Sequence, residues 1–204
     1  MNFIKRGVKV VNGDIRKFDE ILKVTENQNT LIHLAAKISV SQSILNPSET
    51  FEVNVDGTKN VLEACKKNNI KKIIVASSAA VYGNPNCLPV TEETFPNPVS
   101  PYGADKLSME FYLRAFANAY DMNSVSLRFF NVFGEGQQLY RIITKTILSG
   151  LLGEKLSLHG GGTSERSFIH IDDVSDATFK VMHNGIPGET YHISTEEKIS
   201  IKDL

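Results

Sequence analysis

The stretch from Ile73 to Lys106 contains three side chains whose types and spacing could move a proton. Tyr102 and Lys106 are four residues apart in a segment that begins with Ser100-Pro101, and proline suits a first helical turn. Positions four residues apart lie side by side on one face of a helix, so the phenol and the ammonium are expected to be neighbours. Ser78 ends an apolar run of strand length upstream of this segment. Together the three groups could remove a proton from an alcohol and return it.

An ordinary tyrosine has a pKa of roughly 10, and a nearby cation favours its deprotonated form. We therefore expect Lys106 to lower the pKa of Tyr102, so that the phenol can exchange a proton near neutral pH. Ser78 should stand at the carboxyl end of a strand, where open α/β sheets bind ligands. A Tyr–Lys pair at this spacing also arises by chance in ordinary helices. The hydroxyl at the strand end and the Ser-Pro helix start favour the catalytic interpretation of Ser78, Tyr102 and Lys106.

Composition limits the classes of protein to which the chain can belong. Its 204 residues suffice for one well-buried core, and 41% hydrophobic and 22% charged residues are typical of a globular protein. The formal net charge is -1 and no block of Lys or Arg is long enough to bind a polyanion, so no nucleic acid partner is expected. No run approaches the ~18 apolar residues that span a bilayer, and the start of the chain lacks the apolar core of a signal peptide. We expect no membrane partner and a cytoplasmic location.

Cysteine and histidine spacing indicates no metal site. Cys65 falls in a helical pattern and Cys87 in a loop, without a second pair, so both are expected to be free thiols. The histidines lack ligand spacing; they are His33, His159, His170, His183 and His192. Metal-dependent chemistry is not predicted.

The first two thirds of the chain alternate between strand and helix patterns. This order predicts a parallel sheet with right-handed crossovers. The run from Thr30 to Ala36 is continuously apolar, as a strand buried on both faces should be. The predicted strands are 9–11, 30–34, 72–76 and 124–129, and the predicted helices are 17–27, 48–68 and 102–120.

Small and polar residues interrupt these patterns at two places. Ala35-Ala36 follows a strand, where it would let a ligand approach the backbone or let a helix pack closely, and the sequence does not decide between the two. Asn54 and Gly57 lie inside the helix predicted over 48–68. Glycine costs a helix about 1 kcal/mol relative to alanine. These two residues indicate close packing or a polar role for Asn54.

The pattern changes after Gly134, which divides the chain into a region 1–134 and a smaller α+β region 135–204. A helix is predicted over 142–151, a short strand over 156–158, a flexible turn at 160–162 and a last strand over 188–193. Asp172 or Asp173 is expected to cap a helix that ends near His183, in preference to acting as a catalytic pair. Ser200 is expected to cap a further helix.

Seven motifs in one order resemble the extended short-chain dehydrogenase/reductase family, and within it the NAD-dependent nucleotide-sugar epimerases and dehydratases, with UDP-glucose 4-epimerases as the nearest type. The resemblance implies a Rossmann-like, doubly wound parallel sheet with a small substrate-binding portion. It covers essentially the whole chain. The motifs are Gly13-Asp14-Ile15-Arg16, His33-Leu34-Ala35-Ala36, Asn54-Val55-Asp56-Gly57-Thr58, Ser77-Ser78-Ala79-Ala80-Val81-Tyr82-Gly83, Tyr102 to Lys106, Arg128-Phe129-Phe130-Asn131-Val132-Phe133-Gly134, and Arg166-Ser167-Phe168-Ile169-His170-Ile171-Asp172-Asp173.

The resemblance also implies roles for individual residues. Asp14 would hydrogen-bond the adenine of NAD and Ile15 would pack on it. Asn131 and Arg166 would contact the diphosphate of the sugar nucleotide, a role that suits an amide and a guanidinium. The other expected cofactor-binding residues are Leu34, Ala35, Ala36, Asn54, Tyr102, Lys106 and Phe130.

By this resemblance the reaction is oxidation at C4 of the sugar, followed by return of the hydride to its opposite face. Related 4,6-dehydratases carry an acidic pair directly after the position of Ser78, because eliminating water needs an acid and a base. Here those positions are Ala79 and Ala80, which cannot transfer protons. An epimerase is therefore favoured over a dehydratase, and a dehydratase or reductase of the same family is the alternative.

The sequence departs from the family pattern at its start. The Gly-rich turn between a strand and a helix that holds the pyrophosphate is missing, and Gly160 to Gly162 does not lie in that context. We therefore expect an N-terminally truncated sheet, a strand 9–11 without its neighbour, and weak binding of NAD. A non-catalytic remnant, or a partner chain that supplies the missing half, is the alternative. In the full-length family a homodimer is expected.

Overall fold

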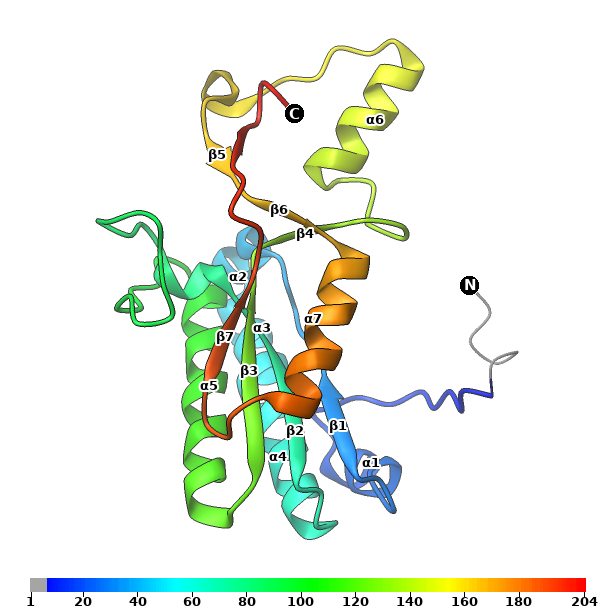
Figure 1. Ribbon diagram of the computed structural model, residues 1–204. Coiled ribbons are helices and arrows are strands. Elements are labelled where there is room, and N and C mark those ends of the chain that lie inside the picture. Colours follow the sequence, from blue (N-terminus) through cyan, green and yellow to red (C-terminus); the bar gives the residue numbers. More distant parts are fainter. Residues whose placement is uncertain (1–6) are drawn as a thin grey trace.

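A computed structural model describes residues 7–204 and contains a parallel sheet of four strands in the order β1-β2-β3-β7 (Figure 1). Parallel pairing joins each strand to the next, with Ile32 opposite Ile74 and Ser78 opposite Phe129. The α/β class and the parallel sheet predicted from the sequence are thereby confirmed. The strands are β1 (Thr30–His33), β2 (Lys72–Ser78), β3 (Asn123–Phe129) and β7 (Thr190–Ile193).

Helices cover both faces of this sheet and form two apolar cores. On one face lie α1 (Phe18–Val24), α4 (Gly57–Lys67) and α5 (Pro101–Tyr120), whose buried side chains pack against Ile73 and Val75 of β2. On the other face α7 (Ile171–Asn184) packs against Ile74 and Leu127, and Figure 1 shows it crossing in front of the sheet. Alternate residues of β2 therefore belong to different cores, as the period of a strand requires.

Helix α5 begins and ends where local chemistry dictates. The Ser100 hydroxyl accepts a hydrogen bond from the Gly103 amide at 3.1 Å, and Pro101 occupies the first turn. At the other end Asp121 adopts a left-handed conformation with φ of 52°. The helix predicted from Tyr102 is confirmed, and its first turn is fixed by a cap beside the expected proton-transfer residues.

The single helix predicted over 48–68 is instead three consecutive segments. They are α3 (Pro47–Phe51), a π-helical turn (Glu52–Asp56) and α4, and α2 (Val40–Leu45) precedes them without having been predicted. The Asn54 amide is fully buried and bonds both the backbone N–H and the carbonyl of Lys37, at 2.8 and 3.0 Å. A Cβ on Gly57 would lie 2.6 Å from Ile15 Cδ1, so only glycine fits there. Both unusual residues thus have packing reasons.

The remaining strands form a separate portion at the top of Figure 1. There β4 (Asn131–Phe133) pairs with β6 (Phe168–His170), and β5 (Glu165–Arg166) pairs with β8 (Ile199–Ser200). Helix α6 (Ile142–Leu152) lies beside them. The chain then returns, because α7 and β7 belong to the main sheet. The division at residue 134 stays a prediction, but the fourth strand of the main sheet comes from its C-terminal side.

Three local predictions in the C-terminal third were wrong. Segment 156–158 forms no strand. His170 caps α7 by accepting the Asp172 amide at 3.3 Å, which leaves Asp172 and Asp173 inside the first helical turn, where carboxylates favour the helix dipole. Ser200 belongs to β8, and its hydroxyl bonds the Asp203 carboxylate in a turn. Each correction reflects a tertiary or capping contact that local spacing does not reveal.

The predicted strand 9–11 and the two-sided burial of β1 were also wrong. Val10 and Val11 are 62% and 53% exposed and form no strand. Strand β1 pairs only with β2, and its burial is one-sided: His33 is buried, whereas Ile32 is 45% exposed and Leu34, just beyond the strand, 61%. A strand needs a neighbour to satisfy its backbone, and segment 9–11 has none in residues 7–204. The sheet therefore ends at an apolar, unpaired edge.

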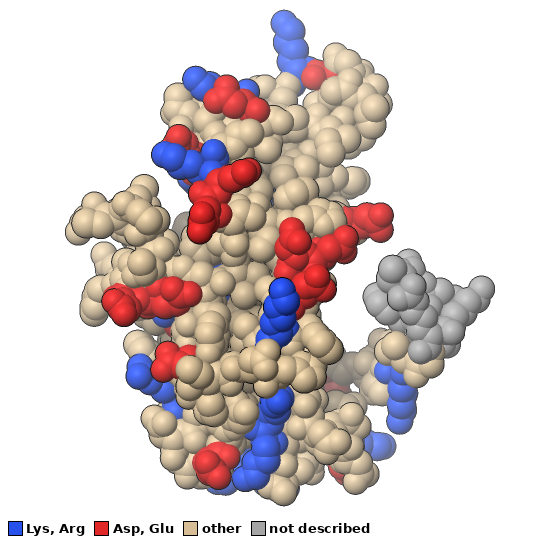
Figure 2. Space-filling view, in the orientation of Figure 1, with Lys and Arg blue, Asp and Glu red and all other residues tan. Residues whose placement is uncertain are grey.

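On the face that Figure 2 shows, the charged residues do not gather into one surface of a single sign. Figure 2 shows Lys and Arg side chains interspersed with Asp and Glu, without a continuous basic stripe on that face. Among the helices of residues 7–204, none is both long enough and apolar enough to cross a membrane. Within the same residues no cluster of three or more His, Cys, Asp or Glu side chains could hold a metal ion.

The edge formed by β1 should drive self-association. An exposed edge strand with apolar side chains is a template for pairing with another chain, and a lysine on it opposes such pairing. We expect Ile32→Lys to reduce the concentration-dependent increase in mass seen by sedimentation velocity, with little loss of stability because Ile32 is already 45% exposed. Leu139→Lys, at a loop position 68% exposed, is the control and should leave association unchanged. Equal association of the two variants would contradict this role of the edge.

Candidate active site

The structure brings Ser78, Tyr102 and Lys106 together at the carboxyl end of β2. The Lys106 ammonium lies 5.9 Å from the centre of the Tyr102 ring and donates a hydrogen bond of 2.7 Å to the Ala76 carbonyl. Ser78 ends β2, and its hydroxyl interacts with that of Tyr102 closely enough to lower the pKa of the phenol. The two helix residues thus share one face, with the serine hydroxyl in front of them. Their catalytic roles stay predictions.

The pKa of Tyr102 does not follow the sequence expectation. Burial raises it above the ordinary value of 10, while Ser78 and, more weakly, Arg141 oppose the rise. Lys106 is not among the groups that lower it. Burial in turn lowers the pKa of Lys106 to about 8, against the pull of Asp105 and Glu110. The phenol is therefore a proton donor at neutral pH, and its partner is a cation close to its titration point.

A cavity of about 980 Å³ opens beside Ser78 and lies within the size range of ligand pockets. All three residues expected to bind the substrate line it: Ser78, Asn131 and Arg166. The Asn131 amide donates to the Ser167 carbonyl at 2.9 Å, and the exposed Arg166 guanidinium donates to the Glu165 carbonyl at 2.7 Å. Phe130, expected near the nicotinamide, also lines the cavity. One wall thus carries an amide and a guanidinium, which suit a diphosphate.

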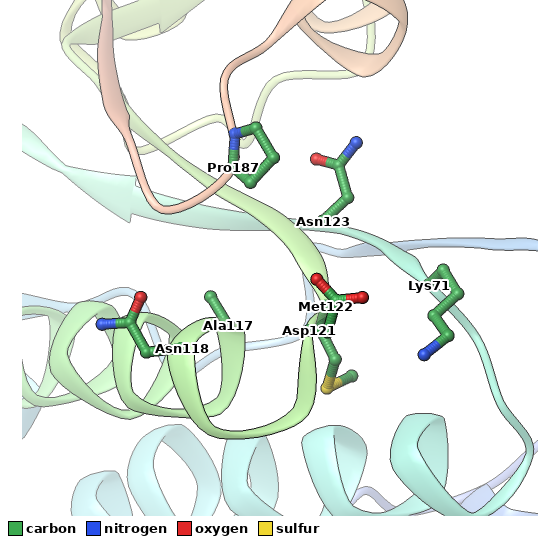
Figure 3. A pocket seen from close by; sticks show the side chains of 7 residues that line it. All are labelled: Lys71, Ala117, Asn118, Asp121, Met122, Asn123 and Pro187. Carbon is green, nitrogen blue, oxygen red and sulfur yellow. The ribbon is translucent and has the colours of Figure 1, made fainter.

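A second hollow of about 590 Å³ lies at the opposite end of the sheet. Figure 3 shows Lys71, Asp121, Asn123 and Pro187 around it, at the amino ends of β2 and β3. None of the expected site residues lines it. Ligands of parallel sheets bind at the carboxyl ends of strands, so the cavity beside Ser78 is the better candidate.

The residues expected to hold the adenosine part lie away from the cavity, around α1 and β1. Arg16 bonds the Asp14 carboxylate at 2.6 Å and lowers the pKa of Asp14 to about 2. Asn60 anchors this turn by donating to the carbonyls of Ile15 and Arg16 at 3.1 and 3.0 Å. The carboxylate is therefore held ionised at a turn fixed from α4.

The segment after β1 is open to ligand approach. Leu34 and Ala35 are exposed and Ala36 is half-buried, so Ala35 does not pack closely against a helix. The buried amide of Asn54 bonds the backbone of Lys37, and its expected contact with the cofactor stays a prediction. These two hydrogen bonds fix the backbone of the segment after β1.

Sequence reasoning missed a buried polar cluster next to the site. Arg128 of β3 and Glu110 of α5 form an ion pair in which both side chains are 6% exposed, and Tyr82 and His192 extend it. The sequence did contain a clue to this cluster: Arg128 is a charged residue in a predicted strand, and Glu110 follows Lys106 by one helical turn.

Asp105 was also missed. It is only 5% exposed, and its Oδ2 atom has no hydrogen-bond partner within residues 7–204. Burial raises the pKa of Asp105 to about 6, against the lowering effects of the Asn54 amide and the Lys106 ammonium. A buried carboxylate of this kind destabilises the fold when it is charged.

Replacing Asp105 should therefore change how stability depends on pH. Since the folded-state pKa lies above the ordinary 3.8, the wild type loses stability as pH rises from about 4 through 6, by about 2 to 3 kcal/mol in total. We expect Asp105→Asn to be more stable than the wild type at pH 8 by about 2 kcal/mol and nearly equal to it at pH 4, as measured by urea denaturation. The control is the same substitution at exposed Asp176. An advantage of the variant that is the same at both pH values would contradict the assigned burial cost.

Comparisons with known proteins agree with this architecture. The model of the NAD dependent epimerase/dehydratase family matches residues 2–194. A protein of Methanocaldococcus jannaschii provisionally named a UDP-glucose 4-epimerase is 36% identical over 100% of this chain and 68% of its own length. The UDP-glucose 4-epimerase of Thermotoga maritima, solved with UDP-glucose, superposes with a TM-score of 0.93 at 29% identity, over 97% of this chain and 66% of that one.

Dehydratases of the same family match as well. A dTDP-glucose 4,6-dehydratase variant from Streptomyces venezuelae, solved with NAD bound, gives a TM-score of 0.89 at 29% identity, over 94% of this chain and 60% of that chain. The chain thus spans roughly two thirds of the length of these relatives. With this match over nearly all of its residues, the chain belongs to the NAD-dependent epimerase/dehydratase family.

Proposed function

We propose that the chain carries the acid–base and substrate-binding residues of an NAD-dependent nucleotide-sugar 4-epimerase. The observation that carries this proposal is the convergence of Ser78, Tyr102 and Lys106 beside a cavity that Asn131 and Arg166 line. Tyr102 exchanges the proton of the sugar C4 hydroxyl, and Ser78 hydrogen-bonds the same oxygen. Asn131 and Arg166 hold the diphosphate. NAD supplies the acceptor and later the donor of the hydride.

The residues present fit a dinucleotide at one point in particular. Lys106 is 3% exposed, and its ammonium makes one hydrogen bond within residues 7–204, to the Ala76 carbonyl. An ammonium has three donors, so two are left for a ligand. The hydroxyls of a nicotinamide ribose would satisfy them. The orphaned donors of a buried cation thus support Lys106 as a cofactor contact.

The family also contains dehydratases, and the residues after Ser78 argue against that activity here. Ala79 and Ala80 are half-buried in a short helical turn directly after β2. Neither side chain can act as the acid or the base that elimination of water requires. Turnover of UDP-glucose without loss of water is the reaction that these residues support.

The assembly of the chain stays a prediction. Phe51, Phe111 and Tyr112, on α3 and α5, are 47%, 60% and 40% exposed. Large exposed apolar side chains on adjacent helices are typical of protein interfaces. They support the homodimer expected from the family, with these helices in the contact.

Product analysis tests the proposed reaction. The full chain is incubated with UDP-glucose and millimolar NAD, and products are identified by chromatography and mass spectrometry. We expect UDP-galactose, and Tyr102→Phe should slow its formation by about 10² to 10⁴-fold because the proton-transfer group is removed. Tyr120→Phe, at the far end of the same helix and 40% exposed, is the control and should be unaffected. A 4-keto-6-deoxy product would assign a dehydratase, and turnover that survives Tyr102→Phe would reject the assigned base.

Binding of NAD is tested separately by isothermal titration. Residues 7–204 contain no Gly-rich turn between a strand and a helix, and therefore no helix N-terminus of the kind that holds the pyrophosphate in this family. We expect the chain by itself to bind NAD more weakly than micromolar, and Lys106→Met to weaken binding further. Micromolar affinity for NAD would show that the residues from Asp14 to Phe130 suffice without that turn.

A further inference from the structure

A buried ion pair joins the helix of the proton-transfer residues to the sheet. Arg128 Nη2 lies 2.7 Å from Glu110 Oε2, and Arg128 Nε donates to Glu110 Oε1 at 3.0 Å. Ser77, the neighbour of Ser78, donates its hydroxyl hydrogen to the same carboxylate. Helix α5, strand β2 and strand β3 therefore share one charged centre. The second amino group of the guanidinium, Nη1, points on to Tyr82.

Three polar groups meet at the Tyr82 hydroxyl, and their types assign its proton. Arg128 can only donate to it, and the Thr91 carbonyl, 3.0 Å away, can only accept. His192 Nε2 is 2.6 Å from the same oxygen. The phenol has one hydrogen, and we assign it to the Thr91 carbonyl, because a carbonyl can only accept whereas His192 Nε2 can either donate or accept. His192 must then donate through Nε2–H, which fixes the tautomer of a neutral ring.

His192 connects this centre to the wall of the cavity. Its ring makes edge contacts with Tyr82 and Phe130, at centroid distances of 5.5 and 5.2 Å. Its backbone N–H donates to Glu92 Oε1 at 2.8 Å, so β7 is tied to the segment 84–99. Tyr82, Phe130 and His192 line the same cavity as Ser78. Figure 1 shows segment 84–99 projecting away from the sheet.

The charges around the ring favour its neutral form. Burial lowers the pKa of His192 below 6.5, and Arg128 lowers it further, whereas Glu92 and Glu110 raise it. The Glu92 carboxylate is 3.9 Å from Nδ1, beyond hydrogen-bond distance. At pH 7.5 the ring is therefore neutral.

We propose that His192, as the neutral Nε2–H tautomer, is a positioning residue for the cavity: through Tyr82 and Glu92 it holds segment 84–99 and Phe130 where a nucleotide sugar contacts them. The identity of that ligand rests on the proposed function. The hydrogen-bond arrangement does not, since it is present without any ligand.

Two variants separate the donor from the ring. His192→Gln can keep an N–H donor near the Tyr82 hydroxyl, whereas His192→Phe keeps a ring against Phe130 and removes the donor. Calorimetric titration of the full chain with UDP-glucose should give about tenfold weaker binding for His192→Phe, since one lost buried hydrogen bond can be worth about 1.4 kcal/mol, and a change within about threefold for His192→Gln. His183→Phe in α7, outside the cavity, is the control. Equal affinity of His192→Phe and the wild type overturns the proposal.

A ligand-free measurement keeps the two proposals distinguishable. Imidazole ¹⁵N chemical shifts at pH 7.5 should show His192 protonated at Nε2, and hydrogen exchange in segment 84–99 should be faster in His192→Phe than in His192→Gln. A dominant Nδ1–H tautomer, or equal exchange in the two variants, overturns the positioning role. If the wild type binds no UDP-glucose, the proposed function fails, and the tautomer and exchange data still decide the role of His192.

Discussion

The structure depends on one buried contact, the bidentate ion pair between Glu110 of α5 and Arg128 of β3. A pair that is 6% exposed on both sides is held by geometry, because its desolvation cost is large and only well-aligned hydrogen bonds offset it. It sits one helical turn beyond Lys106 and uses the hydroxyl next to Ser78 as a further donor. The helix with the phenol and the strand with the serine cannot shift relative to each other without breaking it. A fixed spacing between Ser78 and Tyr102 follows from that constraint.

Burial at this site also changes the pKa values of Tyr102 and Lys106. Burial raises the pKa of Tyr102 and lowers that of Lys106, so both groups move toward their neutral forms. A neutral phenol can only give its proton first or be activated by an added charge. The pKa of Lys106, about 8, lies below that of Tyr102, so the lysine loses its charge before the phenol ionises and does not stabilise the phenolate. The proton-transfer roles of the two residues stay predictions.

Sequence predicted those parts of the structure that depend on local pattern. The helix start at Ser100-Pro101, the apolar strand before Ser78 and the alternation of elements all have local causes, and all were confirmed. Ile32 is exposed because β1 has no second neighbouring strand in residues 7–204. The π-helical turn at Asn54 involves a hydrogen bond to the backbone of Lys37, 17 positions away. The cluster around Tyr82 joins residues up to 110 positions apart. The spacing of apolar residues carries no information on such contacts. The charges of Arg128 and Glu110 within predicted elements were the only indication of the cluster that we find in the sequence.

The charge of Lys106 then depends on Asp105, a residue of the Tyr102 to Lys106 motif for which no role was predicted from the sequence. Asp105 and Glu110 both raise the pKa of Lys106, with Asp105 the stronger of the two. Glu110 is already neutralised by Arg128, whereas Asp105 has an unpaired oxygen and a pKa of about 6. Near neutral pH the ammonium therefore keeps its proton largely because Asp105 is ionised beside it. Ionised Asp105 therefore destabilises the fold and at the same time keeps Lys106 protonated. A substitution that removes the burial cost also lowers the pKa of Lys106.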